Sequence, residues 1–194
     1  MFNKIFKNVS GSELSSVERR EKKLTALEFT YGEVEFVYFL SLLKLARKEE
    51  GGVFWDLGCG TGKALVSAAL SYNSFTKICG VELLDNLYKA AKESISKYIT
   101  QTQESNNKVK DLFIVLQDDM TKVDWSNADV LYIASICFPK ELMGALMQKA
   151  RLLKKGAIII TLKNWEDNKN FKVLYNLRVK MTWGKNGVFI LERI

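Results

Sequence analysis

Two hydrophobic patterns follow one another along the chain, and their order predicts alternating strands and helices. Short, continuous apolar runs predict buried strands. Such runs occupy residues 53–57, 77–82, 112–116, 130–133 and 157–162. Segments with apolar residues at helical spacing lie between them, at 62–72, at 85–98 and from Pro139 to the region before Gly156. Because strands that alternate with helices form parallel sheets, we predict an α/β fold with helices on both faces of the sheet.

The part of the chain before the first strand is expected to be helical. Ser12–Lys23 predicts a short charged helix with Ser12 as its capping residue. A second helix is predicted over Glu33–Glu49, where apolar residues recur close to the helical period. We expect residues 1–30 to form an N-terminal helical extension and residues 31–194 to form one globular domain.

The last part of the chain departs from the alternation. Two strand-like runs, Phe171–Trp183 and Val188–Leu191, flank Lys185-Asn186-Gly187. Asn-Gly is a strong signal for a hairpin turn. The sequence therefore predicts that an antiparallel hairpin closes a mostly parallel sheet of seven strands.

Composition excludes some classes of function. With 194 residues and 47% hydrophobic content, the chain fits one domain of ordinary size. It contains no histidine, which disfavours hydrolase triads and zinc chemistry. Cys59, Cys79 and Cys137 have no CxxC spacing, so we expect reduced thiols, no disulfide and no metal site.

Charge and hydropathy bear on partners and location. The net charge of +7 favours acidic partners such as nucleic acid or nucleosomes, and a lysine-rich solvated surface is the alternative explanation. No apolar stretch approaches the roughly 20 residues of a membrane span. The N-terminal MFNKIFKNVS lacks the apolar core of a secretory signal. We therefore expect an intracellular protein, nuclear or cytoplasmic, without membrane contact.

The segment VFWDLGCGTGK, residues 53–63, joins a strand to a helix through a glycine-rich turn, and the next strand ends at Glu82. This combination is how a doubly wound sheet holds a nucleoside. A dinucleotide fingerprint needs its third glycine at the position of Lys63, and the carboxylate of Asp56 would repel a diphosphate. A ligand with a cationic amino group suits this turn better.

S-adenosylmethionine is a ligand of that kind. Its ammonium group can lie near Asp56, its chain can cross the glycine turn, and its ribose diol can bind both oxygens of Glu82. The turn residues expected to contact it are Gly58, Cys59, Gly60, Thr61, Gly62 and Lys63. The pattern DxGxGxG with a downstream acid resembles the class I methyltransferases, which have a Rossmann-like fold and release S-adenosylhomocysteine. A glycine turn that binds nothing is the alternative.

The segment Thr30–Glu33, TYGE, precedes the first strand and adds a third motif. Thr30 and Glu33 have the spacing of a capping box, which would give them a structural role at a helix start. With DLGCGTG and GVE following in this order, the chain also resembles the disruptor-of-telomeric-silencing family of non-SET histone lysine methyltransferases. The resemblance extends from about Tyr31 to Trp165. It implies that Tyr31 and Glu33 fold over the methionine end of the cofactor.

Asp119 and Met120, in the segment QDDM, stand where this family has an acid followed by an aromatic residue. The resemblance implies that Asp119 accepts a hydrogen bond from the adenine amino group and that Met120 lies on the ring face. An acidic turn after a strand is the alternative. Lys63 replaces the glutamine of the family, and its ammonium group can pair with the cofactor carboxylate.

The acceptor side departs further from the family pattern. Ala134 and Ser135 stand where the family has paired asparagines, and Phe138 matches the aromatic residue that follows. The catalytic candidates expected around the acceptor are Tyr31, Ser135, Phe138 and Trp165. Apolar, aromatic walls would favour the neutral form of an acceptor lysine, although each aromatic residue also fits an ordinary core position. An asparagine in place of Ser135 is expected to restore an amide beside the acceptor.

The residues thus predict an S-adenosylmethionine-dependent methyltransferase without a metal, since in-line transfer from a sulfonium needs mainly alignment. The resemblance implies that it acts on lysine of a histone or nucleosome. Methylation of RNA or of a small molecule is the second hypothesis. A cofactor-binding partner subunit without turnover is the third. The sequence leaves the oligomeric state open.

Overall fold

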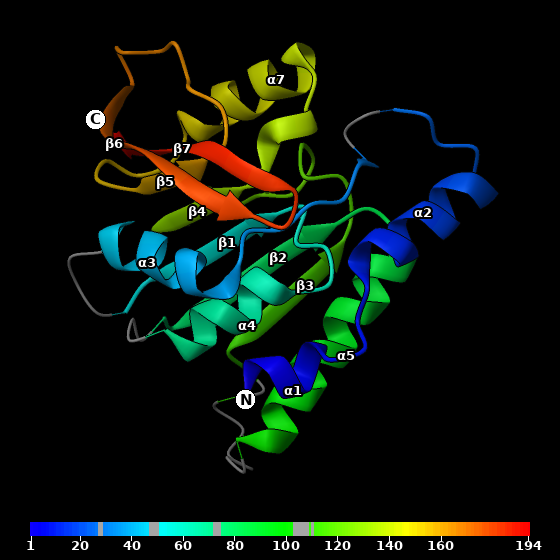
Figure 1. The fold of residues 1–194 in the computed structure, drawn as a ribbon. Helices are drawn as coiled ribbons and strands as arrows, with labels where there is room; N and C mark the ends of the chain where they lie inside the picture. The colour runs from blue at the N-terminus through cyan, green and yellow to red at the C-terminus, as the bar shows by residue number, and fades with distance from the viewer. Residues whose placement is uncertain (27–28, 47–50, 72–74, 103–108, 110) are drawn as a thin grey trace.

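The computed structural model describes the chain except residues 27–28, 47–50, 72–74, 103–108 and 110 (Figure 1). The described residues form a seven-stranded sheet in the order β3-β2-β1-β4-β5-β7-β6. Its strands are β1 (Val53–Leu57), β2 (Lys77–Glu82), β3 (Phe113–Gln117), β4 (Val130–Ile133), β5 (Ile158–Thr161), β6 (Phe171–Met181) and β7 (Gly184–Arg193). Strands β1 to β5 are parallel, whereas β7 is antiparallel to both β5 and β6. The predicted fold class is confirmed.

Helices cover both faces of the sheet (Figure 1). On one face lie α1 (Phe2–Phe6), α3 (Phe36–Ala46), α4 (Lys63–Leu70) and α5 (Asp85–Gln101), and on the other lies α7 (Lys140–Ala150). Helix α2 (Gly11–Glu21) packs along α5, and the 3-10 helix η2 (Ser135–Cys137) follows β4. The boundary at residue 30 between extension and domain stays a prediction. No described helix has the length and apolar character that crossing a membrane requires.

Strand β1 shows how the sequence fills both layers. Phe54 belongs to the core on the side of α3 and α4, while Trp55 and Leu57 belong to the core on the side of α7. This is the two-residue period of a strand that is buried on both faces. Strand order reverses between β1 and β4, so the carboxyl ends of these strands flank a crevice, the usual ligand site of such sheets.

Helix α2, which was predicted over Ser12–Lys23, spans Gly11–Glu21. Its capping residue is Ser10 rather than Ser12, because the Ser10 hydroxyl accepts the N–H of Glu13 at 3.4 Å. The side chain of Ser12 lies only beside that hydroxyl, at 3.4 Å. An oxygen three residues before a free N–H is the ordinary geometry of an N-cap, and the sequence offered two serines in reach.

Helix α3 begins at Phe36, so the prediction that it starts at Glu33 is wrong. Val34 instead forms a β-bridge with Met181, and the N–H of Glu35 donates to the carbonyl of Lys180 at 3.4 Å. Pairing with β6 keeps this segment extended. The predicted end of the helix, at 47–49, lies outside the described residues.

The hairpin turn lies at Thr182 and Trp183, so the prediction that Asn186-Gly187 forms it is wrong. Asn186 and Gly187 lie within β7, opposite residues of β6. The N–H of Thr182 donates to the carbonyl of Glu33 at 3.0 Å, which fixes the turn against the segment before α3. A contact between distant segments thus outweighs the local turn signal.

Candidate functional site

The glycine-rich turn after β1 is fixed to the end of β2. The N–H groups of Gly58 and Cys59 donate to the carbonyl of Val81 at 2.8 and 3.0 Å. Gly58, Gly60 and Gly62 all have positive φ, at 83°, 54° and 82°. Since glycine adopts these values without a Cβ penalty, the turn needs all three glycines that the motif supplies.

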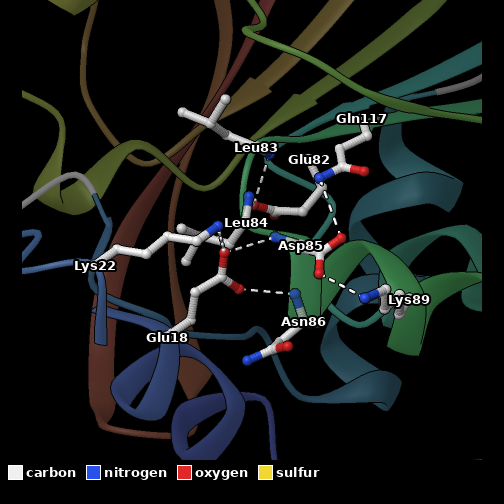
Figure 2. Close-up of polar contacts among 9 residues, drawn as sticks. All are labelled: Glu18, Lys22, Glu82, Leu83, Leu84, Asp85, Asn86, Lys89 and Gln117. Atoms are coloured by element: carbon white, nitrogen blue, oxygen red, sulfur yellow. Dashed lines mark hydrogen bonds and ion pairs between the residues drawn. The ribbon is translucent and has the colours of Figure 1, made fainter. Parts of the chain in front are cut away.

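Glu82 is buried and links the glycine-rich turn to the residues that follow β2. Its Oε2 accepts the N–H of Gly60 at 2.8 Å. Its Oε1 accepts the N–H groups of Leu83 and Leu84 at 2.8 and 2.9 Å (Figure 2). Burial raises the pKa of this carboxyl, and the three N–H groups oppose that rise. A carboxylate has about four acceptor positions. Glu82, which lines the larger of the two cavities at this site, therefore keeps acceptor capacity on Oε2.

Asp56 is 2% exposed, and its Oδ1 has no hydrogen-bond partner. It lines a small hollow of about 40 Å³ together with Glu33, Gly60 and Lys63. Burial, with Glu82 nearby, raises the pKa of Asp56 well above its usual range. A buried acid without a partner costs free energy that a cationic group in the hollow would recover. This orphaned oxygen fits the ammonium group of S-adenosylmethionine.

The segment around Tyr31 covers this hollow. The Tyr31 ring lies between two glycines, because a Cβ on Gly11 would overlap it and a Cβ on Gly60 would lie 2.6 Å from its Cε2. The Tyr31 hydroxyl donates to Glu33 and lies 3.1 Å from the Thr61 hydroxyl. The TYGE segment therefore contacts the glycine turn, and the place of Tyr31 and Glu33 over the methionine end of the cofactor stays a prediction.

Glu33 has no capping role in the structure. Helix α3 begins after it, and its side chain accepts hydrogen bonds from Tyr31, from Lys63 Nζ and from Thr61 at 3.5 Å. Burial raises the pKa of Glu33, and the hydrogen bond and charge of Lys63 oppose the rise. The capping-box alternative is thus wrong. Lys63, which we expected to be available for the cofactor carboxylate, is paired with Glu33 and lies 5.6 Å from the ring centroid of Phe6.

A larger cavity of about 350 Å³ adjoins the hollow and shares Tyr31, Gly32, Gly58 and Ala134 with it. Of the predicted site residues, it is lined by Tyr31, Gly58, Glu82, Asp119, Met120 and Phe138. Cys59 lines the small hollow, as do Glu33, Asp56, Gly60 and Lys63. Thr61 and Gly62 line neither cavity. Thr61 is a hydrogen-bond partner of Tyr31, and Gly62 is the residue before α4.

Asp119 and Met120 line this cavity and not the small hollow. Asp119 Oδ1 accepts the N–H and the hydroxyl of Thr121 at 2.8 and 2.7 Å, and the N–H of Thr121 is the main cause of its lowered pKa. Oδ1 of Asp119 therefore makes the local contacts that the acidic-turn alternative expects, while the residue still lines the cavity. Met120 faces Gly58, where a Cβ would lie 3.5 Å from its Cε.

The structure does not bring Ser135 and Trp165 to the cavity. The Ser135 hydroxyl is buried between β4 and β5, 2.9 Å from that of Thr161, and accepts the N–H of Leu162 at 3.3 Å. Trp165 is buried against Phe171, with the ring centroids 5.0 Å apart. Their predicted place beside the acceptor is wrong. Ala134 lines both hollows instead.

Several cavity residues were missed from sequence. They are Phe29, Thr30, Gly32, Leu57, Leu83, Leu84, Leu87, Thr121, Ala134 and Leu142. Leu83 and Leu84 carried a usable signal, because they directly follow the acid at the carboxyl end of a parallel strand. Phe29 and Leu142 carried none, since they reach the cavity through the path of the chain. Within the described residues, no three His, Cys, Asp or Glu side chains gather as a metal site.

Comparison with known proteins agrees with this geometry. A family model described as histone methylation protein DOT1 matches residues 16–181. The chain belongs to the DOT1 family. The family resemblance drawn from the TYGE, DLGCGTG and GVE motifs is thereby confirmed.

Curated relatives of this DOT1-family chain include lysine methyltransferases. It is 28% identical over 141 residues to a histone-lysine N-methyltransferase specific for H3 lysine-79 from Eremothecium gossypii, covering 70% of this chain and 24% of that protein. It is 25% identical over 136 residues to a protein-lysine N-methyltransferase from Saccharolobus islandicus, covering 68% of this chain and 77% of that protein. The chain thus spans about a quarter of the Eremothecium relative.

Solved structures share the fold of this DOT1-family chain. An RNA methyltransferase from Salinibacter ruber in complex with S-adenosyl-L-homocysteine matches with a TM-score of 0.61 and 19% identity, covering 81% of this chain and 90% of that one. Magnesium protoporphyrin IX methyltransferase from Synechocystis, with bound S-adenosylhomocysteine, matches with a TM-score of 0.62 and 11% identity. That match covers 100% of this chain and 92% of the other.

Proposed function

We propose that this DOT1-family chain transfers a methyl group from S-adenosylmethionine to a lysine side chain of a protein, with a histone as the first candidate. The observation that carries the proposal is the buried, unpartnered Oδ1 of Asp56, in a hollow that adjoins the cavity lined by Glu82. A cofactor with a cationic head and a nucleoside tail matches both parts of this site.

Each part of the cofactor has residues suited to hold it. Asp56 and Glu33 present carboxylates to the amino-acid head. Glu82 offers an acceptor to the ribose hydroxyls, and Met120 offers an apolar surface to the adenine ring. When bound, S-adenosylmethionine supplies an electrophilic methyl group on a sulfonium. The Lys63 ammonium, which neutralises Glu33, keeps the head of the site from accumulating unopposed negative charge.

The acceptor side is apolar. Phe138, Leu142 and Ala134 line the larger cavity beside Tyr31. Such walls disfavour an ammonium ion and so lower the pKa of a lysine that enters, which makes the neutral amine available for in-line attack. The chain's own contribution is to exclude water and align the amine with the methyl group.

A histone is the preferred partner because the relatives from Eremothecium and Dictyostelium are named histone H3 lysine-79 methyltransferases. The net charge of +7 also suits an acidic assembly such as the nucleosome. An intracellular site of action, in nucleus or cytoplasm, follows from this partner. RNA is the second candidate acceptor, favoured by the same charge and by Ala134, which lines the cavity in place of a family asparagine.

The proposal is tested in three separate reactions, each of which contains the protein and isotope-labelled S-adenosylmethionine. The acceptor is nucleosomes in the first, free histones in the second and total RNA in the third. Mass spectrometry then locates the methyl groups, and Asp56→Asn serves as the control for cofactor binding. Lysine methylation on histones that is lost in Asp56→Asn supports the proposal. Methyl groups on RNA alone support the second candidate. Cofactor binding without transfer to any of the three supports a partner subunit without turnover.

A further inference from the structure

Helix α2 contacts two segments beside the cofactor cavity, although none of its own residues lines the cavity and no cofactor motif lies within it. On one side, the Ser15 hydroxyl donates to the carbonyl of Phe29 at 2.9 Å, and Gly11 packs against the ring of Tyr31. Phe29 and Tyr31 both line the cavity. On the other side, Glu18 binds the first two residues of α5, which directly follow the cavity-lining residues Leu83 and Leu84. Figure 1 shows α2 lying along α5.

Glu18 supplies the cap that α5 lacks. Leu84 precedes the first residue of α5 and has no side chain that accepts a hydrogen bond. Glu18, which is 1% exposed, accepts the N–H of Asp85 on Oε1 at 2.9 Å and that of Asn86 on Oε2 at 2.7 Å (Figure 2). Free N–H groups in the first turn of a helix need such acceptors, and a carboxylate also interacts favourably with the helix dipole.

Glu18 and Glu82 divide four consecutive backbone N–H groups between them. Those of Leu83 and Leu84 donate to Glu82, and those of Asp85 and Asn86 donate to Glu18. Figure 2 shows both carboxylates bound to this one segment, Leu83–Asn86. Because the segment Leu83–Asn86 is bound at both ends by buried acids, its path, and with it the orientation of Glu82, depends on the position of Glu18.

We propose that Glu18 is a positioning residue for the nucleoside half of the cofactor site, acting on Glu82 through the segment Leu83–Asn86. The inference rests on the proposed cofactor site. Lys22 supports this arrangement, since its Nζ lies 2.5 Å from Glu18 Oε1 and balances the charge of a second acid near Glu82. Burial alone would raise the pKa of Glu18, but the hydrogen bonds from Lys22, Asn86 and Asp85 together lower it, so the carboxylate is charged at neutral pH.

The test measures binding of S-adenosylhomocysteine and of adenosine by titration calorimetry, at a temperature well below the melting temperature of each variant. Glu18→Gln keeps the shape of the side chain but removes one acceptor, so both ligands should bind roughly tenfold more weakly, the scale of a charged hydrogen bond. Glu21→Gln, on the exposed part of the same helix, should leave both affinities unchanged.

A double-mutant cycle separates positioning from general destabilisation. If Glu18 acts through Glu82, Glu18→Ala should weaken adenosine binding in the wild-type background and have little further effect beside Glu82→Ala. Unchanged adenosine affinity in Glu18→Gln, or fully multiplicative losses in the double variant, would overturn the inference while the cofactor site stands. If the wild-type protein binds neither ligand, the proposed cofactor site itself fails.

Discussion

The ring of Tyr31 packs against Gly60 so closely that a Cβ on Gly60 would lie 2.6 Å from Tyr31 Cε2. This contact joins the segment before α3 to the glycine turn after β1. Gly60 is therefore required for two reasons, a φ of 54° that side chains rarely adopt and a space that the Tyr31 ring fills. The cover of the cofactor hollow depends on both.

The first prediction concerns Gly60→Ala. The left-handed backbone alone should cost about 1–2 kcal/mol of folding stability, and the overlap should also move Tyr31 and weaken binding of S-adenosylhomocysteine. Gly156→Ala is the matched control, because Gly156 has a φ of 85° but nothing within 4 Å of an added Cβ. Both variants should lose stability in thermal unfolding, Gly60→Ala the more because of the overlap, and only Gly60→Ala should lose affinity in calorimetry. Equal affinities in the two variants would contradict a role for the Tyr31 contact.

The second prediction is a pH dependence set by Asp56. Burial raises the pKa of Asp56, so the folded protein without cofactor binds this proton more tightly than the unfolded chain does. Its contribution to stability is therefore present at low pH and is lost as the pH rises through the raised pKa. An ammonium group beside Asp56 favours the carboxylate, so binding releases a proton and the affinity for S-adenosylhomocysteine should rise with pH.

Calorimetry in two buffers of different ionisation enthalpy measures that proton directly. Asp56→Asn should bind more weakly and release no proton from this site. Since asparagine has no ionisable group, the stability of the Asp56→Asn variant against unfolding should lack the part of the pH dependence that Asp56 causes. An affinity of the wild-type protein that falls as the pH rises would contradict the assignment of the ammonium group to Asp56.

The third prediction is that Glu33 contributes to binding of the amino-acid end of the cofactor and not of its adenosine end. Glu33→Gln removes a charge whose burial is already costly, so the stability of the protein without cofactor should change little. Binding of S-adenosylhomocysteine should weaken roughly tenfold through the lost charged hydrogen bond, and binding of adenosine should not change. Glu35→Gln is the control, since Glu35 pairs with Lys180 at the surface, 3.0 Å away. An equal loss for both ligands would return Glu33 to a structural role.

Sequence patterns predicted the parts of the site that depend on local order. The bounds of β1, β2 and β4 were right because each is a short apolar run between glycine or polar segments. Asp56, Gly60 and Glu82 come together because parallel strands end at one edge of the sheet. The order of motifs, rather than any single one, gave the family.

What the sequence did not show are the contacts between distant segments. The start of α3 and the place of the hairpin turn are both set where Val34 pairs with Met181. Glu18 lies in a charged helix that resembles any solvated surface helix, and its burial arises only when α2 packs on α5. Local propensity carries no information about such packing, so no pattern could mark this residue.

The last prediction concerns the end of β4, where an amide was expected to help if placed at position 135. Ser135 is fully buried, and its hydroxyl oxygen lies at hydrogen-bond distance, 2.9 Å, from that of Thr161. Ser135→Asn would therefore force a larger polar side chain into the space between β4 and β5. Overpacking of this kind costs typically about 1–3 kcal/mol. Ser135→Asn should therefore lower the melting temperature without improving transfer.

Ala134→Asn places the amide where the cavity is, because Ala134 lines both the hollow beside Asp56 and the larger cavity. This variant should keep the wild-type melting temperature within a few degrees and increase methyl transfer to histone lysine, since the amide can orient the incoming amine. Thermal unfolding and mass spectrometry of reacted nucleosomes check the pair of variants side by side. A stable, activated Ser135→Asn beside an inactive Ala134→Asn would place the acceptor at the Ser135 side of the strand and contradict the cavity as its site.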